Sequence, residues 1–302
     1  MKTLRILVGL LTKDNDYQIE QANSAAQMAS NLGVDARIIY ADNDAINQST
    51  QILKAIQTTP EDRPDAVVFE PASGTALQQV ARAAVAANVG WVVMNREADY
   101  IAELRQTSKA PVFSVSADHL ETGRIQGRQF SALLPAGGSV LFIQGPYDSA
   151  AAKERLLGTM EVKPTNIHFI FVKGQWTEES ARRAVQSWLK LATSRKAHVD
   201  LIGSQNDAMA IGARKAFQEI TIESERDGWL SLPYTGCDGL PKTGQSWLRS
   251  GLLSATIYVP PLAGQAIELL VGAYQRHTIP PARVLISPTS IPAIEALRPL
   301  KR

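Results

Sequence analysis

Short apolar segments alternate along this 302-residue chain with longer segments whose apolar residues recur at helical spacing. The apolar segments show little alternation of hydrophobic and polar residues, which predicts strands buried on both faces. Such strands occur in parallel sheets that helices cover on each side, so the sequence predicts an α/β fold with doubly wound parallel sheets. The expected strands are 5–11, 35–40, 65–70, 91–95, 111–116, 139–145, 166–172, 199–204, 232–238 and 252–259. The expected helices are 16–32, 45–58, 76–87, 121–134, 150–161, 178–193, a helix that begins after Asn206, and 262–275.

The length of the chain favours two lobes, because a single hydrophobic core usually stops growing below this size. No stretch rich in proline, glycine and serine separates the halves, so we expect several short crossings between the lobes rather than one tether. The net charge of +2 gives no basis for nucleic-acid binding. The single cysteine, Cys237, excludes an intrachain disulfide.

The N-terminus has a charged residue and a short apolar run, as a shortened signal peptide would. However, Lys13, Asp14 and Asp16 follow at once, and no small-residue cleavage site is present. A first strand is therefore the better interpretation of this run. No segment has the roughly 20 apolar residues of a membrane span.

The common motifs of nucleotide binding and hydrolysis are missing. No G-x-G-x-x-G follows the first expected strand, and neither a G-x-x-x-x-G-K-[ST] loop nor a G-x-S-x-G elbow occurs. The histidines are scattered, and none pairs with the cysteine at metal-ligand spacing, so we expect no metal and no cofactor. Because no nucleophile–base pair is visible, we expect a protein that is not an enzyme.

Polar side chains follow many of the expected strands, and ligands of parallel sheets bind beyond the carboxyl ends of the strands. A sugar hydroxyl both donates and accepts, so it suits an Asp or Asn beside an Arg, and the C–H faces of a sugar ring pack on Trp or Tyr. The pattern therefore favours a polyhydroxylated ligand. The strand ends include Asn15, Tyr17, Glu70, Asn95, Arg96, Trp176, Asn206, Asp238 and Tyr258.

Asn206 and Asp207 stand together where an expected strand passes into a helix. Either residue type can cap a helix or contact a ligand. We expect Asn206 to direct its amide at the ligand, and Asp207 to cap the helix or brace the turn.

Several motifs carry a resemblance to a known family. "IQGPYDSAAAKERLLG" at 143–158 matches a Gln-Gly…Ser-x-x-x-Arg-x-Arg-x-x-Gly pattern, and "QNDAMAIGARKAF" at 205–217 is similar to Gln-Asn-Asp-x-Met-Ala-x-Gly. "GCDG" at 236–239 resembles Gly-Phe-Asp-Gly. These patterns, over nearly the whole chain, resemble periplasmic sugar-binding proteins of the ribose-binding type, the receptors of ABC importers.

The resemblance implies a type I periplasmic binding protein fold with two lobes joined by a hinge of several crossings. The implied lobes are 1–116 with 260–287, and 117–259 with 288–302. The ligand-binding residues that it implies are Asn15, Tyr17, Asn95, Arg96, Arg155, Trp176, Asn206, Asp238 and Tyr258. Trp176 would stack on the ligand, and Arg155 takes the ligand-contacting arginine position.

Departures from the family pattern bear on the ligand. Asp16 and Gln18 replace Pro and the second Phe of an Asn-Pro-Phe-Phe turn, and Asn95 replaces Asp in an Asp-Arg pair. Cys237 replaces a large aromatic residue, and Val259 stands where the family often has Gln. These changes remove contacts to a pentose and open space, so we expect a hexose-sized sugar or polyol rather than ribose. We interpret Cys237 as a small buried hydrophobic residue without a redox role.

The resemblance implies hinge closure around a monosaccharide or polyol between the lobes, followed by delivery to a membrane permease. We expect a monomer in the periplasm or another extracytoplasmic location, with the signal peptide absent from this sequence. One alternative is the sensor domain of a signalling receptor, which shares the fold. Another is the core of a lac-repressor-family regulator, which would need a DNA-reading helix-turn-helix before the first strand; none precedes it in this sequence.

Overall fold

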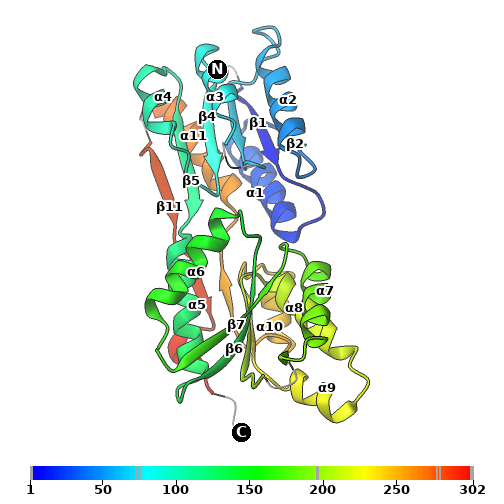
Figure 1. Ribbon diagram of the computed structural model, residues 1–302. Coiled ribbons are helices and arrows are strands. Elements are labelled where there is room, and N and C mark those ends of the chain that lie inside the picture. The colour runs from blue at the N-terminus through cyan, green and yellow to red at the C-terminus, as the bar shows by residue number, and fades with distance from the viewer. Residues whose placement is uncertain are drawn as a thin grey trace. The chain divides into compact units, whose positions relative to one another are not determined.

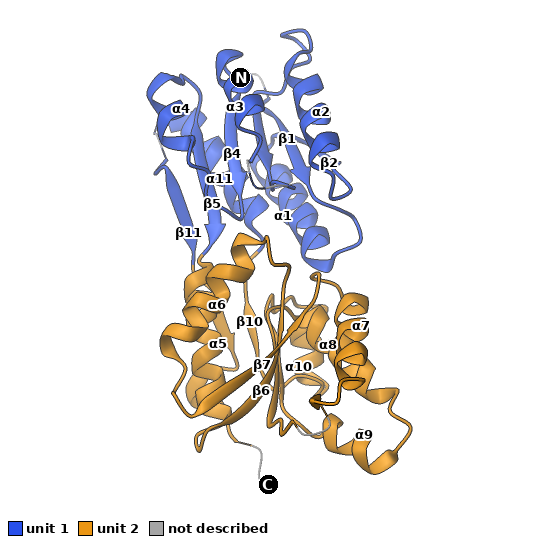
Figure 2. Cartoon of the chain, in the orientation of Figure 1, with its two compact units in different colours: residues 1–117, 261–286 blue, residues 118–260, 287–302 orange. Residues whose placement is uncertain are grey.

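The computed structural model describes residues 3–72, 74, 76–194, 197–276, 278 and 280–299. It divides into two compact units (Figure 2). Unit 1 comprises residues 1–117 and 261–286, and unit 2 comprises residues 118–260 and 287–302. The chain therefore passes from one unit to the other after residues 117, 260 and 286.

Unit 1 contains a six-stranded parallel sheet in the order β11-β5-β4-β3-β1-β2 (Figure 1). Its strands are β1 (Arg5–Leu10), β2 (Asp35–Tyr40), β3 (Ala66–Phe69), β4 (Gly90–Met94), β5 (Val112–Ala117) and β11 (Arg283–Ile286). Strands β3, β4 and β5 are buried along their whole length, as the absence of alternation predicts. The edge strands β2 and β11 are partly exposed, because each has a neighbour on one side only.

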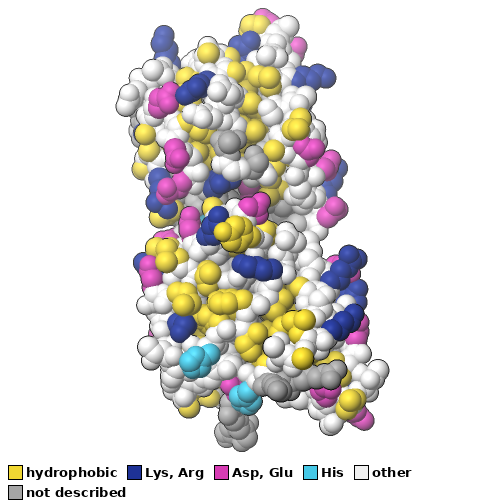
Figure 3. Space-filling model, in the orientation of Figure 1, with side chains coloured by type: hydrophobic (Ala, Val, Ile, Leu, Met, Phe, Trp, Pro, Cys, Tyr) yellow, Lys and Arg dark blue, Asp and Glu magenta, His cyan; other side chains and the backbone are white. Residues whose placement is uncertain are grey.

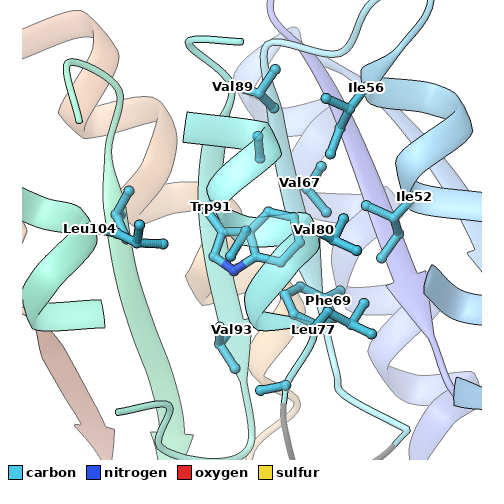
Figure 4. Close-up of a cluster of buried hydrophobic side chains, with 14 of the residues drawn as sticks. Ile52, Ile56, Val67, Phe69, Leu77, Val80, Val89, Trp91, Val93 and Leu104 are labelled. Carbon is cyan, nitrogen blue, oxygen red and sulfur yellow. The ribbon is translucent and has the colours of Figure 1, made fainter. Parts of the chain in front are cut away.

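Helices cover both faces of this sheet. They are α1 (Asp16–Leu32), α2 (Ala45–Ile56), α3 (Gln78–Ala86), α4 (Ile101–Thr107) and α11 (Leu262–Arg276). Side chains of α2, α3 and α4 form one core with the sheet, and side chains of α1 and α11 form the other. In the first core, Trp91 packs on Phe69 with ring centroids 4.6 Å apart, and Val80 and Ile52 lie around this pair (Figure 4).

Unit 2 contains a four-stranded parallel sheet in the order β7-β6-β8-β9. Its strands are β6 (Gly138–Gln144), β7 (Ile167–Lys173), β8 (Leu201–Ser204) and β9 (Tyr234–Thr235). The helices of this unit are α5 (His119–Leu133), α6 (Ala150–Val162), α7 (Glu178–Leu189), α8 (Asp207–Gln218), α9 (Glu223–Leu230) and α10 (Gly244–Arg249), with a 3-10 turn at Ile294–Ala296. The α/β fold with parallel sheets that the sequence predicts is confirmed.

The last expected strand, 252–259, differs from the expectation. Only Thr256–Tyr258 (β10) is a strand, and it pairs antiparallel with β12 (Thr289–Ile291) in a separate two-stranded sheet. Two single parallel bridges, Thr235 to Ala255 and Asp238 to Tyr258, connect this segment to the end of the main sheet. The ladder cannot continue beyond it, because Pro260 and Pro261 lack the N–H groups that a ladder requires.

Candidate functional site

Three of the sequence-predicted site residues lie together in unit 2. Arg155 of α6 is buried, and its Nη1 donates to the backbone oxygen of Gln205. The same Nη1 lies 3.8 Å from Oδ1 of Asp238, which gives an ion pair that solvent screens little. The guanidinium carbon lies 5.6 Å from the ring centroid of Trp176, within the range of a cation–π contact. Carboxylate, guanidinium and indole therefore form one cluster.

Close packing of α5 against α6 places Arg155. A Cβ atom at Gly123 would lie 2.0 Å from the backbone oxygen of Arg155, and one at Gly158 would lie 2.0 Å from the backbone oxygen of Leu120. Glycine at both positions lets the two helix backbones approach each other more closely than side chains would allow. The sequence carries this signal, because Gly123 and Gly158 lie inside segments of helical periodicity, where glycine is otherwise unfavourable.

Trp176 lies in the loop that follows β7, in the left-handed region of backbone space with φ 64°. Its indole lies directly over Gly145, which follows β6: a Cβ atom at Gly145 would lie 2.3 Å from the ring. The indole is half-buried between this backbone and the Arg155 guanidinium. Only a residue without a side chain fits at position 145 in this arrangement.

Asn206 is the N-cap of α8, a role in addition to the ligand contact that the sequence predicts for it. Its Oδ1 accepts from the backbone N–H of Met209 at 2.9 Å, and its Nδ2 donates to the backbone oxygen of Trp176 at 2.9 Å. Asp207 is not the cap. Its Oδ2 accepts from the backbone N–H of Gly239 at 2.7 Å, and its Oδ1 accepts from the Thr256 hydroxyl at 2.6 Å. Asp207 therefore braces the turn at residues 238–239 against β10.

Burial shifts the pKa values of two groups next to this cluster, the Asp207 carboxyl group and the Cys237 thiol. Burial raises the pKa of Asp207 well above its ordinary value, and the nearby charge of Asp238 raises it further, whereas Thr256, Gly239 and Arg155 oppose the shift. Burial also raises the pKa of the Cys237 thiol. Cys237 is 1% exposed, so this side chain is buried, as expected.

Tyr258 lies at the end of β10, beside the backbone of Asp238. The N–H of Asp238 donates to the oxygen of Ile257 at 2.9 Å, and the N–H of Val259 donates to the oxygen of Asp238 at 3.0 Å. Tyr258 is half-buried, whereas Val259 is buried. Asp238 itself has φ 99°, and the residue after it, Gly239, donates its backbone N–H to Asp207.

In unit 1, Asn15 is the N-cap of α1. Its Oδ1 accepts from the N–H of Tyr17 at 2.9 Å and from the N–H of Gln18 at 3.3 Å. The sequence suggests a ligand contact for Asn15, and the structure adds this capping role. Tyr17 is half-buried in the first turn of the helix.

Asn95 and Arg96 follow β4, and both are half-buried. Asn95 has φ 62°, a conformation that Asn tolerates better than most residues, and its Nδ2 donates to Oε1 of Glu70 at 2.8 Å. Arg96 lies near Tyr100: burial raises the pKa of Tyr100 to about 12, while a hydrogen bond with Trp91 and the charge of Arg96 oppose the shift.

Glu70 is a residue whose importance the sequence does not reveal. It follows β3 and is buried, and its Oε2 accepts from Nε2 of Gln18 at 2.7 Å. Burial raises its pKa, and the hydrogen bonds from Asn95 and Gln18 oppose the shift. In the sequence, Glu70 can be recognised only as a charged residue directly after an apolar strand. This pattern marks the end of the strand but does not predict the contact with Asn95.

A groove with a volume of about 540 Å³ lies elsewhere in unit 1, between β2 and α2. Arg5, Arg37 and Lys54 are among its lining residues, and none of the sequence-predicted site residues lines it. We therefore place the candidate site at the Arg155–Asp238–Trp176 cluster of unit 2 and at the side chains around Asn95 and Arg96 in unit 1, rather than in this groove.

The described residues contain no group of three or more His, Cys, Asp and Glu side chains arranged to hold a metal ion. None of the described helices combines the length and hydrophobicity required to cross a membrane. Positive and negative side chains are interspersed over both units on the face that Figure 3 shows.

Comparisons with known proteins agree with the two-unit fold. The ribose import binding protein of Escherichia coli (strain K12) is 24% identical over 257 residues, which cover 84% of this chain and 78% of the relative. A periplasmic solute binding protein of an ABC transporter from Actinobacillus succinogenes 130z, with bound D-allose, superposes with a TM-score of 0.81 at 19% identity and covers 97% of this chain and 98% of its own. The Caulobacter myo-inositol binding protein gives a TM-score of 0.78 at 20% identity, with 95% and 92% covered.

The model of the family described as "Periplasmic binding protein domain" matches residues 6–275. The relatives are named as binding proteins, which confirms the prediction of a binding protein rather than an enzyme. The resemblance stated from the sequence motifs is confirmed as well. The chain belongs to the family of periplasmic binding proteins.

Proposed function

We propose that this protein binds a monosaccharide or polyol and delivers it to the membrane permease of an ABC importer. The observation that carries the proposal is the cluster of Arg155, Asp238 and Trp176 in unit 2. Arg and Asp offer donors and acceptors for neighbouring hydroxyl groups, and the indole offers a flat apolar surface for ring C–H groups. This combination suits a neutral ring that carries many hydroxyl groups.

We propose that Tyr17, Asn95 and Arg96 of unit 1 contact the same ligand molecule, which would then bind between the units. Binding would favour a closed form by hinge motion, since a ligand shifts such an equilibrium only by its higher affinity for one state. Support comes from the positions of these residues, which follow β1 and β4 at the carboxyl ends of parallel strands.

The names of similar proteins support the class of ligand: ribose import, D-allose and myo-inositol binding. For this chain we propose a six-carbon sugar or polyol. Cys237 and Val259 are both small and buried next to Asp238, where larger or hydrogen-bonding side chains would fill space beside a ligand. The location proposed is periplasmic, as for the family.

A thermal-shift screen tests this function, because a ligand that binds only the folded state raises the melting temperature. The panel contains D-allose, D-fructose, myo-inositol, D-ribose, D-apiose and glycerol. We expect the largest increase with a six-carbon compound, and isothermal titration calorimetry then gives its Kd. A largest increase with D-ribose would contradict the proposed size of the ligand, and no increase with any compound would contradict the function.

A further inference from the structure

We propose that Glu70 is a specificity-determining positioning residue: its buried carboxylate holds the amide of Asn95 by Nδ2, so that position 95 offers the ligand an oxygen acceptor. This inference rests on the proposed function and concerns unit 1 only. The role proposed for Glu70 is exerted through the amide of Asn95.

The direction of the hydrogen bonds at Glu70 is fixed from within the fold. The backbone N–H of Leu11 donates at 2.9 Å to Oε1 of Gln18, so the other end of this amide, Nε2, must be the donor toward Glu70. Oε2 of Glu70 accepts from that Nε2 at 2.7 Å, and Oε1 accepts from Nδ2 of Asn95 at 2.8 Å. A carboxylate accepts at both oxygens, so it satisfies both donors at once.

Glu70 is also held rigidly by its backbone. Its N–H donates to the oxygen of Gly9 at 2.9 Å, and its carbonyl oxygen accepts from Nε2 of Gln48 at 2.7 Å. Oε1 of Gln48 in turn accepts from the N–H of Ala72 at 2.9 Å. Because these bonds hold the backbone of Glu70 in place, we expect a change in the polarity of its side chain to reorient the side-chain amide of Asn95.

The same contact explains why position 95 carries Asn rather than the Asp of the Asp-Arg pattern. An aspartate in this conformation would place a second carboxylate oxygen 2.8 Å from the buried Glu70 carboxylate, where the Asn95 nitrogen now lies. Two carboxylates at such a distance do not both ionise. The negative charge beside position 95 is therefore carried by Glu70.

Three variants test this inference: Glu70→Gln, Asn95→Asp and the double variant. In Glu70→Gln, the new amide keeps its oxygen toward Gln18 and turns its NH₂ group toward the NH₂ group of Asn95. Asn95 must then rotate, and position 95 offers a donor instead of an acceptor. In the double variant, the new amide at position 70 donates to the new carboxylate at position 95, and the acceptor returns.

The probe is the compound of the thermal-shift panel (D-allose, D-fructose, myo-inositol, D-ribose, D-apiose or glycerol) that raises the melting temperature of the wild-type protein most. Titration calorimetry should show that each single variant binds it about tenfold more weakly, the size of one mispaired buried polar group. If the two substitutions acted independently, their effects on the Kd would multiply. Because both residues belong to one hydrogen-bond network, the double variant should bind at least about tenfold more tightly than that product.

The control variant is Asp65→Asn, which removes a carboxylate at the opposite end of β3, where Oδ2 accepts from the N–H of Arg5 at 2.8 Å. It should lower the melting temperature without changing the affinity for the probe. If Glu70→Gln does not fold, the comparison of Asn95→Asp with the double variant, both monitored by circular dichroism, still decides.

Two results overturn the inference: a folded Glu70→Gln variant that binds the probe as the wild type does, or losses that simply multiply in the double variant. Failure of the proposed function has a different signature. In that case no compound of the thermal-shift panel raises the melting temperature of the wild-type protein.

Discussion

The side-chain amide of Asn206 joins two elements of unit 2: Nδ2 donates to the backbone oxygen of Trp176 at 2.9 Å, while Oδ1 caps α8. One residue therefore fixes both the start of a helix and the loop that carries the indole. Trp176 has φ 64°, an uncommon conformation for a large side chain, so the hydrogen bond to its carbonyl helps to hold it.

Substitution of Asn206 should separate stability from binding. Asn206→Ala removes the cap and should lower the free energy of unfolding by about 1 kcal/mol, whereas Asn206→Asp retains a good cap and should lose less. Both variants lack the Nδ2 that holds Trp176, so both should weaken polyol binding. Urea unfolding and titration calorimetry measure the two quantities.

A matched control for this experiment is Asp44→Ala, which removes the N-cap of α2 in unit 1, where Oδ1 accepts from the N–H groups of Ile46 and Asn47. It should reduce stability by a similar amount and leave binding unchanged. An Asn206→Asp variant with wild-type affinity would show that the contact with Trp176 is unimportant for the ligand.

Gly145→Ala should displace the indole of Trp176, because the added Cβ would lie 2.3 Å from the ring. We expect a folded protein with a shifted tryptophan fluorescence spectrum and polyol binding weakened by about tenfold or more. Gly228→Ala is the control: nothing lies within 4 Å of its Cβ position in α9, and alanine in a helix should slightly stabilise the protein. Unchanged fluorescence and affinity in Gly145→Ala would contradict the placement of the indole.

The unfolding free energy should depend on pH through Asp207. Its pKa is raised in the folded protein from the ordinary value of 3.8, so its contribution to stability is fully present below pH 3.8 and is lost as the pH rises through the folded pKa. Between these two pKa values, the loss is about 1.4 kcal/mol per pH unit. Asp207→Asn cannot titrate, so the stability of the wild type relative to this variant should fall as the pH rises above about 4.

Urea unfolding of both proteins across this pH range provides the measurement. Glu70 shifts in the same direction as Asp207 and is present in both proteins, so the difference between the two curves isolates Asp207. Two parallel curves would mean that Asp207 titrates normally in the folded state.

Arg155→Ala should abolish ligand-induced compaction in small-angle X-ray scattering while the fold remains intact. The substitution removes the guanidinium that pairs with Asp238 and that would donate to ligand hydroxyl groups, so we expect the Kd to rise by about tenfold or more. Trp176→Ala should have the same effect through loss of the stacking surface. Compaction with D-allose or myo-inositol in both variants would refute the proposed site.

Local features of the sequence predict several elements well. Helix α1 has the predicted bounds of 16–32 because its ends carry their own signals: Asn15 caps the start, and Gly33, with φ 65°, ends it. The buried strands of both sheets are also predictable from local sequence. A strand that is buried on both faces contains few polar residues, so it appears as an apolar run. Short elements such as α4, α9 and α10 have too few turns to show a helical periodicity, so they cannot be predicted in this way.

The α/β class, the parallel sheets and the strand ends that carry the proposed ligand-binding side chains could be predicted from the sequence, because each follows from the periodicity of neighbouring residues. The partners of those side chains could not be predicted, because they depend on tertiary packing. Glu70 meets Gln18 and Asn95, which lie 52 and 25 positions away, and Arg155 meets Asp238 across different elements. Such contacts depend on how the elements pack, and a hydrogen bond between distant residues leaves no periodic signal in the sequence.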